Sequence, residues 1–410
     1  MSGKQNKEIC CGCSACSNVC PKDAITMTED EEGFLYPSVE QKKCIQCGCC
    51  EQVCPVGNTT APGHPYAAYL IQEMSDQVRL KSTSGAAVNA IAVNVLRNGG
   101  CVIGAELSEQ VVCQHIVIEN EEELRRIQGS KYVQSDLGDC FSVIRRELKK
   151  ERLVLFVGMG CQVAGLKAYL NKEYDNLITI DLACHGVPSP GIFREYIEYL
   201  TKKHHKQVTN VVFRDKSYGY SASNVKVYFS DGTSTDCRND IKTFTRLMFN
   251  GLSLRPSCYE CAFKTEGRVS DLTLFDCAMV GTYAPEFDDD KGTTSVLVHS
   301  EKAIALIKAE VLNGNMRAKR VNAEELIKSE GTMLTASAKR NPKREDFFED
   351  RTTLSYEELT KKYAPATSIM FVGNLVKRTL RFTGPLGKSL LKMNKRKSIR
   401  EYQKKYKSTF

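Results

Sequence analysis

Eight cysteines near the N-terminus have a spacing that few kinds of chemistry require. They form two runs of the pattern C-x2-C-x2-C-x3-C-P, which end at Pro21 and Pro55. Bacterial ferredoxins use this pattern: three cysteines of a run hold one [4Fe-4S] cluster and the fourth holds the other cluster. The spacing therefore predicts a first cluster on Cys10, Cys13, Cys16 and Cys54, and a second cluster on Cys44, Cys47, Cys50 and Cys20.

Two other uses of cysteine fit these runs less well. Zinc ribbons use two separated pairs of cysteines and not a triplet with a trailing Cys-Pro. Disulfides need an oxidising compartment, but the polar segment from Met1 to Ile9 lacks the apolar core of a secretion signal, and the total of nineteen cysteines is odd. Cluster ligands in a reducing, oxygen-poor cytosol explain the thiols better. Cys11 and Cys49 have no ligand role in this scheme and are interpreted as small residues that fill space beside the clusters.

Four later cysteines could form another cluster site. Cys161 opens a predicted helix, a position that lowers the pKa of a thiol and suits a metal-bound thiolate. Cys184 follows a predicted strand, and Cys258 and Cys261 form a C-x2-C pair. We expect a third [4Fe-4S] cluster on these four cysteines. Buried structural thiols and a small zinc site are the alternatives.

The pattern of apolar residues predicts that these cysteines lie on a mixed α/β domain. The chain between residues 58 and 65 has the composition of a linker. We expect strands at 66–71, 101–105, 116–118, 153–157, 177–182, 208–213 and 225–229, and helices at 86–97, 121–127 and 162–170.

The segment 153–182 reads as a βαβ unit with a tight turn at residues 158–161. Gly158, Gly160 and Asp181 imitate a dinucleotide-binding fingerprint, but Val163 replaces the third glycine. A second candidate binding segment, Ser82-Thr83-Ser84-Gly85, precedes the helix at 86–97. Because helix N-termini present unpaired N–H groups, this segment could hold a phosphate or the edge of a flavin, and an ordinary serine cap is the alternative.

Length and charge divide the chain further. A chain of 410 residues is expected to form two or three domains, and no apolar stretch approaches the roughly 20 residues of a membrane-spanning helix. Residues 376–410 contain twelve Lys or Arg and one acid, so their net charge is +11, whereas the rest of the chain sums to −3. The basic character therefore belongs to the C-terminal tail.

Apolar residues recur between the basic residues of this tail, which predicts short amphipathic helices. Such a segment can lie on an anionic membrane surface, and a solvated tail is the alternative. No recognised nucleic-acid-binding motif accompanies the charge, so no nucleic-acid partner is expected. We expect a cytoplasmic protein with peripheral membrane contact through residues 376–410.

Several motifs, taken in order, resemble the coenzyme F420 hydrogenase/dehydrogenase beta-subunit family from about residue 66 to about residue 350. They are Ser82–Gly85, Gly129–Ser135, Gly160–Gln162, Cys184–Pro190, Arg255–Cys261, Arg268 and Ser270-Asp271. The resemblance implies a bound flavin, usually FAD, beside iron–sulfur clusters, and hydride exchange with a deazaflavin or another two-electron substrate. It also implies that Cys161, Cys184, Cys258 and Cys261 are cluster ligands, and that the flavin site is bordered by Ser82, Thr83, Ser84, Gly85, Ser130, Lys131, Tyr132, Gln134 and Ser135.

Two segments depart from the family pattern. The family usually has Gly-Thr-Pro-Cys at Gly158–Cys161 and Gly-Asp-Phe-Trp-Gly at Phe275–Met279. Both departures fall in loops expected near the active centre, so they favour a substrate other than coenzyme F420. Cys277 becomes a further candidate cluster ligand.

These observations together predict a flavin-dependent iron–sulfur oxidoreductase, fed by a ferredoxin or another redox partner protein. A flavin converts one-electron transfer into two-electron transfer. Lys131 would stabilise negative charge on the reduced flavin, and His185 would supply a proton. A non-catalytic electron-relay subunit and a reductase of membrane-associated cell-surface polysaccharide biosynthesis are the alternatives.

The expected architecture combines α+β and α/β parts in four regions. A small ferredoxin-like domain at 1–57 precedes a flavin-associated region at 66–145. An α/β region with the later cysteines follows at 146–365, and the basic helical tail occupies 366–410.

Overall fold

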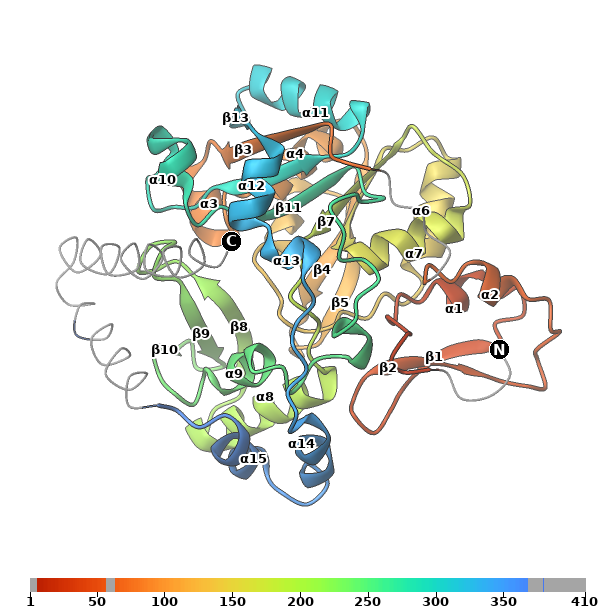
Figure 1. Cartoon of the computed structure of the whole chain (residues 1–410), viewed down its shortest axis with the longest axis vertical. Coiled ribbons are helices and arrows are strands. Elements are labelled where there is room, and N and C mark those ends of the chain that lie inside the picture. Colours follow the sequence, from red (N-terminus) through yellow and green to blue (C-terminus); the bar gives the residue numbers. More distant parts are fainter. Residues whose placement is uncertain (1–5, 57–62, 368–378, 380–410) are drawn as a thin grey trace.

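A mixed eight-stranded sheet organises the computed structural model, which describes residues 6–56, 63–367 and 379 (Figure 1). The strand order is β13-β3-β12-β11-β7-β6-β4-β5. Strands β4, β6, β7 and β11 run parallel, and antiparallel strands extend this centre on both sides. The bounds are β3 Ala67–Glu73, β4 Cys101–Leu107, β5 Cys113–Ile118, β6 Val154–Met159, β7 Leu177–Leu182, β11 Leu272–Asp276, β12 Thr294–Val298 and β13 Met316–Val321.

Helices cover both faces of this sheet because successive strand residues point to opposite faces. In β4, Val102 packs into the core beneath α4, whereas the next residue, Ile103, packs against α6 and α7. The sheet is therefore the middle of three layers. One face carries α4 (Ala87–Arg97), α5 (Leu124–Ile127) and α11 (Glu301–Leu312), and the other carries α6 (Cys140–Lys149), α7 (Gly160–Leu170), α10 (Val280–Tyr283) and α12 (Ala323–Glu330).

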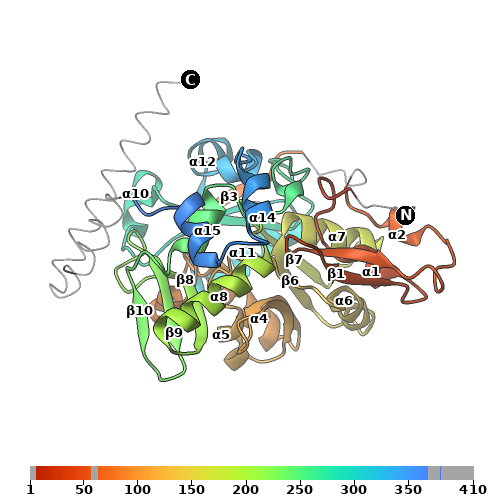
Figure 2. The ribbon, with the colours of Figure 1, turned by 90° about the horizontal axis from the view of Figure 1, so that it is seen from below.

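A second, aromatic core forms around a small antiparallel sheet with the order β10-β9-β8. Figure 2 shows α8 lying alongside β8 and β9. Rings of Phe193, Tyr196 and Phe244 contact one another at the centre of this core. Its elements are α8 (Pro190–His204), β8 (Val208–Asp215), β9 (Asn224–Phe229), β10 (Ser234–Asp236), α9 (Thr243–Phe249), α14 (Arg344–Asp350) and α15 (Tyr356–Tyr363).

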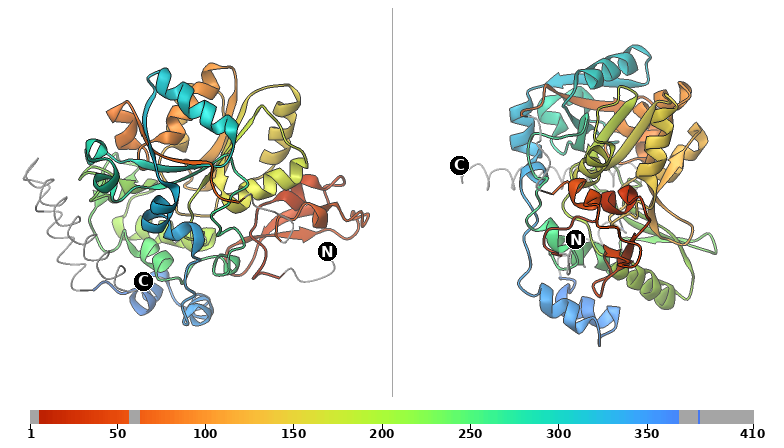
Figure 3. Two further views of the ribbon diagram at one scale, coloured as in Figure 1. Left: turned by 45° about the horizontal axis from the view of Figure 1, so that its top comes forward. Right: turned by 90° about the vertical axis from the view of Figure 1, so that its right-hand side faces the viewer.

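The N-terminal unit is a small ferredoxin-like fold docked on the side of the molecule (Figure 3). Its two strands form an antiparallel hairpin in which Ile25 pairs with Val39. Its first helix packs on α7 and α6, so the unit adds to the helical layer of one sheet face. The elements are α1 (Ala15–Val19), β1 (Ile25–Glu29), β2 (Leu35–Val39) and α2 (Cys49–Gln52). Short elements elsewhere are α3 (Asp76–Lys81), η1 (Glu121–Glu123), η2 (Pro256–Cys258), η3 (Pro285–Phe287) and α13 (Thr332–Thr335).

The expected fold class is confirmed: a small ferredoxin-like domain precedes a mixed α/β domain. The prediction of a tight turn at residues 158–161 is wrong, because β6 continues to Met159 and α7 begins at Gly160 without a connecting turn. Strands from both the 66–145 and the 146–365 regions belong to the same sheet. Most of the basic tail, residues 368–378 and 380–410, lies outside the described residues. Within the described part, no helix is long and apolar enough to cross a membrane.

Candidate iron–sulfur and flavin site

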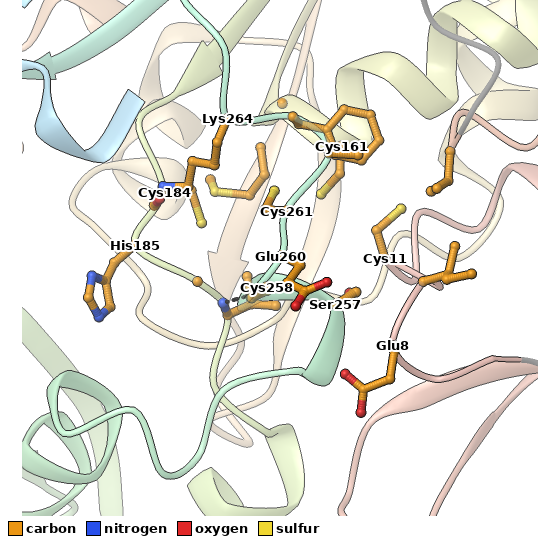
Figure 4. A pocket seen from close by; sticks show the side chains of 18 of the residues that line it. Glu8, Cys11, Cys161, Cys184, His185, Ser257, Cys258, Glu260, Cys261 and Lys264 are labelled. Atoms are coloured by element: carbon orange, nitrogen blue, oxygen red, sulfur yellow. Dashed lines mark hydrogen bonds between the residues drawn. The ribbon is translucent and has the colours of Figure 1, made fainter. Parts of the chain in front are cut away.

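Five cysteines line one cavity of about 320 Å³ (Figure 4). Cys161 lies in the first turn of α7, directly after β6, and Cys184 follows the end of β7. Because β6 and β7 are parallel neighbours, their carboxyl ends bring these two cysteines to the same edge of the sheet. Cys258 ends η2 and Cys261 lies in the loop after it. The structure thus brings together the four later cysteines, and Cys11 joins them from the N-terminal unit.

Among the five cysteines of the cavity, Cys11 alone has no ligand role in the sequence pattern. Hydrogen bonds with the thiols of Cys13 and Cys161 hold the pKa of Cys11 well below its ordinary value. Cys13 is a predicted ligand of the first cluster, and Cys161 is a predicted ligand of the third. Cys11 therefore lies at the boundary between two candidate cluster sites, which only the docking of the N-terminal unit on α7 reveals.

The donor set of the cavity fits a cubane. The cysteines border an open volume from several sides, as the four thiolate ligands of a cluster do. Within the described part of the chain, no three His, Cys, Asp or Glu side chains are placed to hold a single metal ion. Burial raises the pKa of the Cys258 thiol to about 12, so this thiol needs positive charge nearby to act as a ligand.

Two basic side chains supply positive charge at the cavity wall. Lys264 donates hydrogen bonds to the carbonyl groups of Cys184 and Met333. Arg268 donates a hydrogen bond to the Asp181 carboxylate at 3.3 Å. Asp181 belongs to the βαβ segment that imitates a dinucleotide-binding fingerprint. Burial lowers the pKa of Lys264 and raises the pKa of Asp181. Burial raises the pKa of the Cys184 and Cys261 thiols, whereas the charges of Lys264 and Arg268 act to lower it and so favour thiolate at these two positions.

The cysteines predicted to hold the first cluster are grouped in the N-terminal unit. Burial raises the pKa of Cys16 to about 12, and the nearby thiols of Cys10 and Cys54 raise it further. Cys13 is buried against α7: a Cβ atom built on Gly165 would lie only 2.8 Å from the Cys13 Sγ. The first predicted cluster site therefore faces the large domain.

The cysteines predicted to hold the second cluster lie nearer to solvent. Cys47 is exposed, and Cys44, Cys50 and Cys20 are half-buried. The Cys20 Sγ accepts a hydrogen bond from the backbone N–H of Ala24 at 3.3 Å. The second predicted site is thus the one that an external protein can approach.

Arg255 connects the N-terminal unit to the large domain. This side chain is fully buried, and its Nε donates to the Cys10 carbonyl oxygen at 2.7 Å. Its Nη1 donates to the Leu35 carbonyl oxygen at 3.1 Å and to the Gln134 Oε1 at 3.0 Å. Gly12 has a φ of +68°, and a Cβ atom there would lie 2.6 Å from Gln134 and 2.9 Å from Arg255. The cysteine loop and Arg255 are therefore in close contact.

The two segments predicted to border a flavin meet in the structure. The Thr83 Oγ1 lies 2.8 Å from the Ser130 Oγ. Ser84 donates a hydrogen bond to the carboxylate of Asp276, at the end of β11. The Ser82 hydroxyl is buried and has no hydrogen-bond partner among the described residues. An unpaired buried hydroxyl beside the Thr83–Ser130 contact fits a polar group of a bound cofactor.

The serine cap considered for the following helix does not form. Ala86 is the N-cap residue of α4, in a left-handed conformation and without a side-chain cap. Gly85 packs against the sheet, where a Cβ atom would lie 2.2 Å from the Ile71 carbonyl oxygen. The buried Lys216 amine donates to the Ser84 carbonyl oxygen at 2.6 Å. Tertiary contacts therefore fix this loop.

The remaining residues predicted near the flavin face different neighbours. Gln134 bonds to Arg255, and the Ser135 Oγ accepts a hydrogen bond from Gln162 at 3.1 Å. The Lys131 amine donates to the Gln128 carbonyl oxygen at 2.8 Å, just beyond the end of α5. Burial lowers the pKa of Lys131 to about 8.

A chain of aromatic contacts connects the cysteine cavity to the flavin-predicted segments. His185 lines the cavity, and its ring points away from the cysteines in Figure 4. That ring lies 5.4 Å from the ring of Phe249, which in turn lies 6.3 Å from the ring of Tyr132. Arg214 donates to the Tyr132 hydroxyl at 3.3 Å and to Asp276 at 2.8 Å. Burial lowers the pKa of His185, and the charge of Lys264 lowers it further.

Cys277 lies apart from the cysteine cavity. It is fully buried, and its Sγ lies 4.0 Å from a carboxylate oxygen of Glu330. It is not among the residues that line the cavity. Sequence reasoning did not single out Arg214 or Glu330, because neither belongs to a motif and each gains its role from a tertiary contact.

The cysteine runs and the mixed α/β sheet define the class as an iron–sulfur redox protein. Comparison with known families makes this specific. Residues 151–324 match the family model for the C terminus of the coenzyme F420 hydrogenase/dehydrogenase beta subunit, and residues 9–58 match the 4Fe-4S dicluster domain. These two matches support an iron–sulfur oxidoreductase that is similar to this beta subunit over residues 151–324 and carries an N-terminal 4Fe-4S domain.

No curated protein matches the chain. Among solved structures, one similar chain belongs to the F420-reducing [NiFe] hydrogenase complex from Methanosarcina barkeri, in a xenon derivative. The two chains share 15% sequence identity with a TM-score of 0.45, and the match covers 71% of this chain and 94% of the other.

Proposed function

We propose that this chain is an iron–sulfur flavoprotein oxidoreductase that passes electrons between its clusters and FAD. It would exchange hydride with coenzyme F420 or another two-electron substrate. The observation that carries the proposal is the position of the cysteine cavity. Cys11 of the N-terminal unit lines it on one side and contacts Cys13, and His185, Phe249 and Tyr132 lead from it toward the Thr83–Ser130 contact.

The chain supplies the polar groups that such a flavin site needs. A bound flavin would interconvert one-electron and two-electron transfer. The Ser82 hydroxyl is available to bind it, and the contact between Thr83 and Ser130 would position it. The ion pair between Arg214 and Asp276, at 2.8 Å, holds in place the Asp276 carboxylate, which accepts a hydrogen bond from Ser84. His185 is half-buried at the cavity wall and would hold or release a proton there.

Metal analysis of protein purified without oxygen tests the third cluster. We expect about twelve iron atoms and as many sulfides per chain, whereas about eight would contradict the third cluster. Replacing Cys184 and Cys261 with serine should remove about four iron atoms. Cys277→Ser is the matched control, because Cys277 is a buried cysteine outside the cavity, and it should leave the iron content unchanged.

Flavin analysis of the same preparation tests the catalytic part of the proposal. We expect close to one FAD per chain, and bleaching of the flavin when the clusters are reduced. Oxidation of the reduced protein by coenzyme F420 would identify the substrate. Protein with full iron content and without flavin would overturn the proposal and establish a non-catalytic relay subunit.

A further inference from the structure

Two fully buried arginines of the large domain bond to the N-terminal unit, but only one of them is paired with an acid. Arg344 and Arg255 are the largest fully buried side chains of the described residues. Arg344 forms a two-pronged ion pair with Glu32, with distances of 2.8 and 2.5 Å. None of the ion pairs among the described residues includes Arg255, whose nearest partners are backbone carbonyl groups, an amide oxygen and a sulfur.

An isolated buried charge is costly, so the charge of Arg255 needs a compensating partner. The Tyr36 ring lies 4.0 Å from the guanidinium and provides a cation–π contact, but it carries no net charge. The Arg255 Nη2 lies 3.6 Å from the Cys10 Sγ, a predicted ligand of the first cluster. A cubane with four thiolates is anionic, and it becomes more so when it accepts an electron. The first [4Fe-4S] cluster, which the cysteine pattern predicts beside Arg255, would therefore supply the negative charge that this arginine lacks.

We propose that Arg255 is the counter-charge of the first [4Fe-4S] cluster and raises its reduction potential. One electron from a reduced redox partner protein would enter this cluster without breaking a bond, and the added negative charge would lie beside the Arg255 cation. Because the site is buried, little solvent screens this attraction, and the reduced form gains more than the oxidised form. The inference rests on the proposed cluster at Cys10, but not on the flavin or the substrate.

Redox titration of the holoprotein, followed by electron paramagnetic resonance, tests this assignment. Cys16→Ser, prepared separately, identifies the signal of the first cluster. Arg255→Gln removes the charge but keeps donor groups, and we expect it to shift the reduction equilibrium of that cluster about tenfold toward oxidation, or about 59 mV for one electron. Arg255→Lys keeps the charge and should shift the equilibrium less.

A second variant changes the charge without removing Arg255. Because the Gln134 Oε1 already accepts a hydrogen bond from the Arg255 Nη1, Gln134→Glu would place a carboxylate on the guanidinium. We expect this variant to lower the potential of the first cluster in the same direction. Gln134→Glu therefore tests the proposal even if Arg255→Gln does not fold.

Arg344→Gln is the matched control. It removes a buried arginine from the same interface, but one whose charge Glu32 compensates. It should lower the midpoint of thermal unfolding without moving the cluster potential. Equal shifts in Arg255→Gln and Arg344→Gln, or no shift in Arg255→Gln and Gln134→Glu, would overturn the inference. Protein without cluster iron would instead overturn the proposed function.

Discussion

Glu330 is an acid whose environment makes it sensitive to pH. It lies at the end of α12, and its carboxylate accepts hydrogen bonds from the backbone N–H groups of Ala278 at 3.1 Å and Met279 at 2.5 Å. Burial nevertheless raises the pKa of Glu330 from its ordinary 4.5 to about 7. Glu330 therefore helps to fix the loop that follows β11.

The raised pKa of Glu330 predicts a pH-dependent stability. Between pH 4.5 and 7 the folded protein holds more protons than the unfolded chain, so stability falls as pH rises through this window. Above pH 7, the ionised Glu330 lowers the free energy of unfolding by on the order of 3 kcal/mol. Glu330→Gln should therefore raise the midpoint of anaerobic thermal unfolding at pH 8 and have little effect near pH 5. The exposed Glu324→Gln in the same helix should show no such trend, and a pH-independent difference in Glu330→Gln would contradict the prediction.

Helix α7 approaches the N-terminal unit so closely that one of its positions has no room for a side chain. A Cβ atom on Gly165 would lie 2.8 Å from the Cys13 Sγ and 2.9 Å from its Cβ. Alanine is favoured over glycine within helices by about 1 kcal/mol. Loss of stability in Gly165→Ala would therefore report the contact with Cys13 and not the helix itself.

We expect Gly165→Ala to displace the Cys13 loop and to speed the loss of cluster absorbance in air several-fold. Gly63→Ala is the control, because a Cβ atom there meets no neighbour among the residues that the structure describes. Equal rates of cluster loss in the two variants would show that α7 does not support the first cluster site.

The elements that sequence patterns predicted well are those fixed by local patterns. The strand at 177–182 and the helix around 162–170 follow from apolar runs with clear ends. Patterns could not predict that Cys11 would meet Cys161, or that Arg255 would bond to Cys10, because these contacts join distant segments. They depend on how the N-terminal unit docks, which local periodicity does not encode.

At the scale of the whole molecule, the two predicted ferredoxin clusters differ in access. The first faces α7 and the cavity, whereas Cys47 of the second is exposed beside Ile45, which is 57% exposed. Electrons from another protein would therefore enter through the second cluster.

We expect Ile45→Glu to weaken reduction by a protein donor such as a ferredoxin about tenfold, or about 1.4 kcal/mol, because it places a charge in an apolar contact. Reduction by dithionite, which needs no protein contact, should be unchanged. Leu312→Glu is the control: this residue is 86% exposed but lies on α11. Equal effects of the two variants on the protein donor would contradict entry at Ile45.

The position of β3 in the large sheet has a consequence for biosynthesis. This strand precedes most of the chain, but it pairs with β12 and β13, which are translated late. The N-terminal unit forms its hairpin from neighbouring residues and is synthesised before β3. Because domains fold as units during synthesis, the cysteine runs can fold and receive iron while the ribosome is still making Arg255 and the rest of the sheet. Cluster insertion would then come before docking, when the cysteines are still open to the assembly machinery.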